Sequence, residues 1–168
     1  MTSGAQIIEK PAVIFLYAAS PYLFGVASGL LIYWMGEDIT TFMLSRGWAP
    51  ENLYGAVFGI VSVAAGFLLA FYAIVASAGS GVLNAIKGST TYKRYRLTVK
   101  LALIHSLIFI IFSVPYIVAE PLPVSGEGLW AVAIWSGYTI VVFAFFWRVV
   151  ASFFTLMDDD RPSRRGAG

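Results

Sequence analysis

Four long apolar runs constrain this sequence more than any other feature. They occupy residues 12–35, 53–78, 97–118 and 129–157, and none of them contains Asp or Glu. Each meets the length of about 20 apolar residues that an α-helix needs to cross the hydrocarbon core of a bilayer. Backbone groups in hydrocarbon must be hydrogen-bonded internally, and the runs do not alternate as barrel strands do. We therefore predict four transmembrane helices.

The composition supports a membrane protein. Of the 168 residues, 59% are hydrophobic and 12% are charged, whereas a soluble domain carries about 25% charged residues. The first run is longer than the core of a signal peptide, which is about 7–15 residues, so we interpret it as a retained span. The predicted fold class is an all-α membrane protein, a four-transmembrane-helix bundle with small loops. It forms a single domain over residues 1–157, and residues 158–168 are predicted to be a disordered cytoplasmic tail.

The positions of Lys and Arg predict the orientation of these spans. On the predicted map, one side of the membrane has only Arg46, and Arg148 lies inside the fourth run. The other side collects Lys10, Lys87, Lys93, Arg94, Arg96, Lys100, Arg161, Arg164 and Arg165. Because Lys and Arg accumulate in cytoplasmic segments, we predict a multi-pass protein of the cytoplasmic (inner) membrane with both termini in the cytoplasm.

Two features are expected to shape the first span and the segment after it. Pro21 lies inside the first run and predicts a kink, since proline removes a helix hydrogen bond. After the run, apolar and basic residues recur at helical spacing in residues 37–48, which predicts a short helix on the outer face that Pro50 limits. These residues are Ile39, Phe42, Met43 and Arg46.

Glycines repeat at four-residue steps in the first two runs. They are Gly25 and Gly29 in the first run, and Gly55 and Gly59 in the second, where Ser62 and Gly66 continue the series of small residues. Small residues at this spacing let membrane helices approach closely, although glycine is common enough in such helices for the pattern to arise by chance. Both pairs of the GxxxG type fall at similar depth in the outer half. We predict that the first two spans pack there as a tight hairpin, or that one of these faces meets another subunit.

A candidate polar site lies inside the predicted membrane. Arg148 is the only charge well inside a run, and His105 falls at a similar depth. Ser152 shares a helix face with Arg148, and small residues continue this stripe at Gly137, Val141 and Ala144. Intramembrane ionisable groups are candidates for function, and this pair could hold an anion, a lipid headgroup or a water molecule. The alternatives are an arginine that extends to the interface and a histidine that is simply hydrogen-bonded.

A basic patch precedes the third run. In a helix that begins near Thr91, Lys93, Arg96 and Lys100 share one face. Attraction to anionic lipid is worth about 1 kcal/mol for each basic residue near the surface. We expect this face to fix topology and to contact anionic lipid, with docking of a soluble partner as the alternative. Direct nucleic-acid binding is not expected, because no element for base readout accompanies the charges.

Catalysis is not expected from this sequence. It has no cysteine and one histidine, and it offers no nucleophile–base pair, metal cluster or phosphate-binding loop. We therefore expect a protein that is not an enzyme and has no cofactor or metal. Two classes remain: a non-catalytic membrane protein that acts by oligomeric assembly, as a sensor, effector or accessory subunit, and a small oligomeric channel or transporter with a polar site at His105 and Arg148.

One segment resembles known proteins. In residues 68–103 a span is followed by a short loop, a Lys-Gly-Ser-Thr turn and a helix start that contains Tyr-Lys-Arg-Tyr-Arg. This arrangement resembles small four-span bacterial inner-membrane proteins, some of which are membrane components of anti-phage defence systems, such as the membrane subunit of the Kiwa system. The resemblance implies a homo-oligomeric membrane sensor or effector that works with a soluble cytoplasmic partner. It assigns a role to no single residue.

Overall fold

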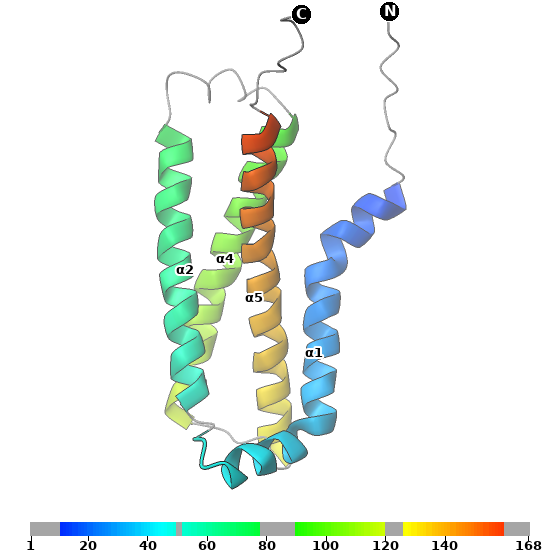
Figure 1. Ribbon diagram of the computed structural model, residues 1–168, viewed down its shortest axis with the longest axis vertical. Helices are drawn as coiled ribbons and strands as arrows, with labels where there is room; N and C mark the ends of the chain where they lie inside the picture. The colour runs from blue at the N-terminus through cyan, green and yellow to red at the C-terminus, as the bar shows by residue number, and fades with distance from the viewer. Residues whose placement is uncertain (1–10, 50–51, 78–89, 120–125, 160–168) are drawn as a thin grey trace, which may run out of the picture.

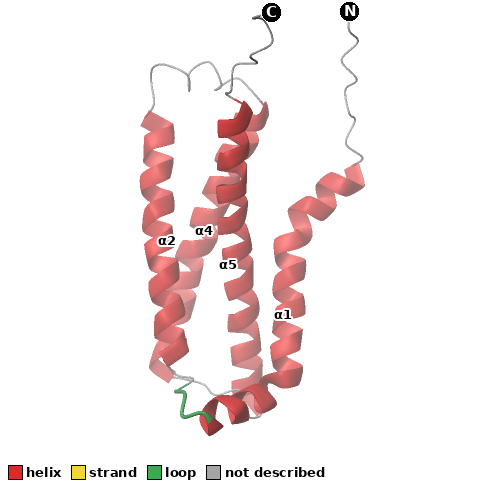
Figure 2. Ribbon diagram, viewed as in Figure 1, coloured by secondary structure: helices red, strands yellow, loops and turns green. Residues whose placement is uncertain are grey.

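Four long helices make up the computed structural model, which describes residues 11–49, 52–77, 90–119 and 126–159. They are α1 (Pro11–Ser45), α2 (Asn52–Ser77), α4 (Thr90–Ala119) and α5 (Gly126–Asp159). No strand occurs in the described ranges (Figure 2). All four helices are long and apolar enough to cross a membrane, which confirms the predicted set of apolar helices. Their insertion and orientation stay predictions.

The helices lie side by side, with α5 in the central position (Figure 1). α1 packs against α5, α5 also packs against α4, and α4 packs against α2. The predicted hairpin between the first two spans is therefore wrong as a description of the main contacts. α1 does not pack on the helix that follows it in sequence, since α5 and not α2 offers the surface that fits α1.

Two apolar clusters join α2, α4 and α5. One contains Leu68 of α2, Val99 of α4 and Phe145 of α5, and the other contains Tyr54, Phe109 and Trp135 of the same three helices. A buried hydrogen bond of 3.0 Å from Trp135 Nε1 to Ser113 Oγ adds a polar link between α5 and α4. These three helices form the core of the described structure, and α1 is added to it along α5.

The end of α1 differs from the prediction. We expected a separate short helix in residues 37–48, but the segment is continuous with α1 as far as Ser45 and runs across the end of the bundle (cyan in Figure 1). Gly47 then adopts a positive φ of 70°. The amide of Trp48 donates to the Met43 carbonyl and the amide of Gly47 to the Leu44 carbonyl, both at 3.0 Å. This pair of bonds is a Schellman motif, so a left-handed glycine ends the helix.

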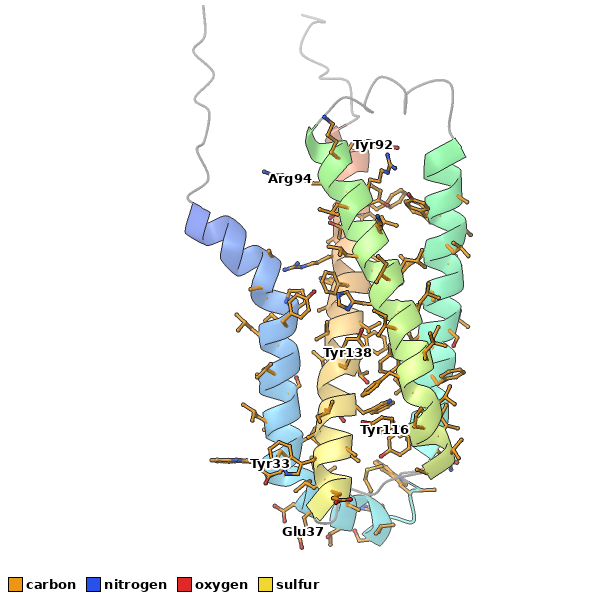
Figure 3. The ribbon with its side chains drawn as sticks, turned by 180° about the vertical axis from the view of Figure 1, so that it is seen from behind. Tyr33, Glu37, Tyr92, Arg94, Tyr116 and Tyr138 are labelled. Atoms are coloured by element: carbon orange, nitrogen blue, oxygen red, sulfur yellow. The ribbon has the colours of Figure 1, made fainter. Side chains whose placement is uncertain are left out.

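The remaining boundaries lie close to those predicted. α4 begins at Thr90 and continues through the third run, which agrees with a helix that starts near Thr91. Tyr92 and Arg94 lie at this end of α4 (Figure 3). We call it the basic end of the bundle, because it holds the patch of Lys93, Arg96 and Lys100. α5 continues to Asp159, two residues beyond the predicted end of the domain, and the remainder of the predicted tail lies outside the described residues.

Candidate functional site

His105 of α4 makes side-chain hydrogen bonds to two other helices. Its Nε2 lies 3.0 Å from the hydroxyl of Tyr22 on α1. Its Nδ1 lies 3.2 Å from the hydroxyl of Tyr138 on α5, and Figure 3 shows Tyr138 about midway along the bundle. One imidazole therefore links three helices, and both of its nitrogen atoms are used.

We assign the tautomer of His105 from the contacts of the Tyr138 hydroxyl. The Tyr138 hydroxyl donates to the backbone carbonyl of His105 at 3.5 Å, so its oxygen is left to accept from Nδ1–H. In a neutral imidazole the other nitrogen is then an acceptor. Nε2 consequently accepts the hydroxyl hydrogen of Tyr22. The hydrogen bonds therefore run from Tyr22 through His105 to Tyr138, and each hydrogen atom takes part in one bond of this series.

Phe145 of α5 brings His105 and Arg148 together. The His105 ring stacks on Phe145 at a centroid distance of 4.7 Å and an interplanar angle of 12°. The guanidinium carbon of Arg148 lies 5.9 Å from the centroid of the same ring, within reach of a cation–π interaction. The edge of Tyr22 completes the cluster, with its ring 5.7 Å from that of Phe145. The sequence placed His105 and Arg148 at similar depth, and the structure gives them a shared aromatic contact.

Arg148 also bonds to α1. Its Nη2 donates to Ser20 Oγ at 2.7 Å. Ser20 and Tyr22 flank Pro21, which is fully buried, so both polar contacts of α1 lie next to its proline. The first turns of α1 bend away from α5 (dark blue in Figure 1), and proline accounts for a bend in this part because it removes a helix hydrogen bond. Ser20, Pro21 and Tyr22 thus fix α1 where it joins the bundle.

Ser152 is the third residue predicted for the polar site. It is half-buried on α5, about one turn from Arg148. The hydrogen bonds and ring contacts of the cluster are made by Ser20, Tyr22, Tyr138 and Phe145 instead. The structure therefore brings together two of the three predicted residues.

The glycines of α1 form a close contact between backbones. A Cβ atom built on Gly25 or on Gly137 would lie 2.7 Å from the carbonyl oxygen of the other residue, and one built on Gly29 would lie 2.9 Å from the Ala133 oxygen. Real side chains essentially never approach so closely. Gly25, Gly29 and Gly137 therefore let α1 and α5 touch, as small residues do between membrane helices.

The glycines of α2 have the opposite surroundings. Gly55, Gly59 and Gly66 are exposed, and a Cβ on any of them would meet nothing within 4 Å. Within the described chain they pack against no helix. The partner of Gly25 and Gly29 is instead the small stripe of α5 that includes Gly137 and Val141.

The basic patch lies on an exposed face of α4. Lys93, Arg96 and Lys100 are all exposed, while Tyr92 and Tyr95 beside them are buried in the core. The three cations therefore share the outer side of the helix, next to the bundle end at which α2 and α5 finish. This position makes them available to a lipid headgroup or to a partner.

Four residues of the polar cluster were missed by the sequence prediction: Ser20, Tyr22, Tyr138 and Phe145. A signal existed for the two tyrosines, since each places a hydroxyl inside an apolar run, and buried hydroxyls need hydrogen-bond partners. Phe145 carried no such signal among the many aromatic residues of the chain. Among the described residues, no group of three or more His, Asp or Glu side chains is placed to hold a metal ion.

The chain was compared with protein-family models, curated proteins and solved structures, and none of the three comparisons finds a match.

Proposed function

We propose that the protein is a non-catalytic integral membrane protein that acts by assembly of several copies in the membrane plane. One observation carries this proposal: α2 presents Gly55, Gly59 and Gly66 on an open face. The chain uses the same four-residue spacing once internally, where Gly25 and Gly29 meet α5. The open face on α2 offers the same kind of contact to a second copy.

The self-association of α2 can be tested through oligomer size. Replacing Gly55 and Gly59 together by Ile places branched side chains on the open face, and we expect the assembly to dissociate while the helical content stays unchanged. The measurement is the mass of the protein–detergent complex in a mild detergent, with energy transfer between labelled copies in vesicles. The matched control is Val63→Leu, which alters an exposed residue of the same helix without a glycine. A wild-type protein that is monomeric in both measurements would refute the assembly.

We further propose that the assembly senses or perturbs the membrane together with a soluble cytoplasmic partner. The resemblance of residues 68–103 to membrane components of defence systems supports this role. The exposed cations Lys93, Arg96 and Lys100 support a cytoplasmic basic end that contacts anionic lipid. A reporter fused after Gly168 tests the orientation, because a periplasmic signal would contradict cytoplasmic termini.

A channel or transporter is the second candidate. The observation in its favour is the junction at which His105 and Arg148 contact Phe145 from α4 and α5. A guanidinium at this position would attract an anion to an oligomeric pathway. Proteoliposomes loaded with chloride should then show flux that Arg148→Leu abolishes. If assembly and membrane activity persist in Arg148→Leu and His105→Ala, the polar-site candidate fails and the assembly proposal stands.

A further inference from the structure

The hydrogen bonds of His105 have a consequence for the attachment of α1. α1 packs mainly on α5, yet Tyr22 reaches His105 on α4, and the same ring reaches Tyr138 on α5. A neutral imidazole has one donor and one acceptor, and this chain of bonds uses both. Any change in the protonation of the ring therefore changes a contact that holds α1.

We propose that the Tyr22–His105–Tyr138 chain is a proton-sensitive latch that holds α1 against α4 and α5. This inference goes beyond the proposed assembly and does not depend on it. Protonation of Nε2 turns that nitrogen from an acceptor into a donor. The hydroxyl of Tyr22 then loses His105 as its acceptor and must turn its own hydrogen away. Nε2–H can then donate to the Tyr22 oxygen, so the bond between α1 and α4 reverses its direction.

The charges around the ring act in the same direction. Protonated His105 would be a second cation on Phe145, whose ring already contacts the Arg148 guanidinium at 5.9 Å. Like charges at such a separation repel each other. Arg148 is also the residue that binds Ser20 of α1, so the repulsion acts on this bond as well as on the bond of Tyr22.

Among the described side chains, the other helices add no further titratable group to this junction. From α1 the ring faces Tyr22, and from α5 it faces Tyr138, with Arg148 across Phe145. The titratable residues described on α2 lie elsewhere: Tyr54 packs on Trp135 and Tyr116, and Tyr72 packs on the core cluster that contains Leu68. The junction therefore contains four titratable side chains, and histidine is the only residue type among them that ordinarily titrates near neutral pH.

Pro21 gives the latch a mechanical effect. Ser20 and Tyr22 lie on either side of it, and α1 bends in this part (Figure 1). Repulsion between the two cations weakens their bonds to Tyr22 and Ser20. The contact of Gly25 and Gly29 with α5 then holds α1. We expect the part of α1 that precedes this contact to move away from α4 at the basic end.

The absence of cysteine from the chain allows a direct distance measurement. Ala18→Cys on α1 and Ile104→Cys on α4 place spin labels on two exposed positions of the full chain in lipid vesicles. Between about pH 8 and about pH 5, the range in which histidine titrates, we expect the distance between the labels to become longer and more broadly distributed. His105→Gln keeps a donor and an acceptor but does not titrate, so its distance should stay short at both pH values.

Tyr22→Phe separates the latch from general effects of acid. It removes the hydroxyl from α1 and should give the broad distribution already at about pH 8. Circular dichroism checks that each variant is folded. Two outcomes would overturn the proposal: an unchanged distance in the labelled His105 protein, or a change in His105→Gln as large as that with His105.

Discussion

α1 and α2 carry the same glycine spacing and attach to the bundle in opposite ways. In the part of α1 whose side chains are described, residues 18–45, the buried residues are all small or compact: Pro21, Gly25, Gly36 and Thr40. The buried residues of α2 include large side chains and form one stripe: Tyr54, Val61, Ala65 and Leu68. Apart from the side-chain bonds of Ser20 and Tyr22, α1 therefore packs closely through its backbone, whereas α2 packs through its side chains.

The difference shows what a small-residue pattern indicates in a membrane helix. Lipid tails are as apolar as leucine, so helices associate through close packing and hydrogen bonds rather than through the hydrophobic effect. A helix can pack closely by having little volume at the contact, as α1 does, or by interlocking large side chains, as α2 does. Added volume should therefore damage the α1 contact, and lost volume should damage the α2 contact.

The largest effect is expected for Gly137→Ile on α5. A Cβ atom alone would lie 2.7 Å from the Gly25 oxygen and 3.4 Å from the Gly29 Cα, and isoleucine adds further atoms that must displace the backbone of α1. Overpacking of this kind costs about 3 kcal/mol, the upper part of the usual range. The free energy of unfolding in mixed micelles should fall by that amount. Gly59→Ile is the control and should leave the stability of a single chain unchanged. Equal losses in the two variants would contradict the difference between the glycine faces of α1 and α2.

Loss of volume on α2 gives the next effect. Leu68 is 3% exposed in the core cluster, and Leu68→Ala leaves a cavity among α2, α4 and α5. We expect a loss of about 2 kcal/mol, the lower end for such truncations, because the hydrophobic part of the cost is small in lipid. The adjacent Leu69 is 57% exposed, so Leu69→Ala, measured by the same unfolding assay, should be nearly neutral. A large loss for Leu69→Ala and none for Leu68→Ala would contradict the assigned faces.

The sequence predicted the four helices because length and hydropathy are local properties of each run. It also placed His105 and Arg148 at similar depth, since depth follows from counting along a helix. Helix partners do not follow from such counting. The pairing of Gly25 with Gly137 depends on which surfaces fit in three dimensions, and chain order suggested α2 instead. Gly47 was a local signal for the end of α1, because a left-handed residue there is most readily glycine.

A smaller effect is expected from loss of the buried hydrogen bond between Trp135 of α5 and Ser113 of α4. Ser113→Ala removes the acceptor of the buried Trp135 indole N–H. Hydrogen bonds between membrane helices contribute about 0.6 kcal/mol on average and up to about 1.7 kcal/mol. We therefore expect the free energy of unfolding to fall by an amount in this range. Ser106 is also buried on α4 but donates to the Ala102 carbonyl of its own helix at 2.8 Å. Ser106→Ala should cost less, and the reverse order would show that the indole has another partner.

The smallest effect, and the most direct check of α2, is expected for Gly66→Ala. A Cβ at this position would meet nothing within 4 Å, and alanine favours the helix more than glycine does. The free energy of unfolding of a dilute, single chain should change by no more than about 0.5 kcal/mol, towards higher stability. A loss above about 1 kcal/mol would exceed what an exposed position allows and would mean that Gly66 is covered within one chain. The open face of α2 would then be a packing surface of the fold, as the glycine face of α1 is, and would no longer support assembly between copies.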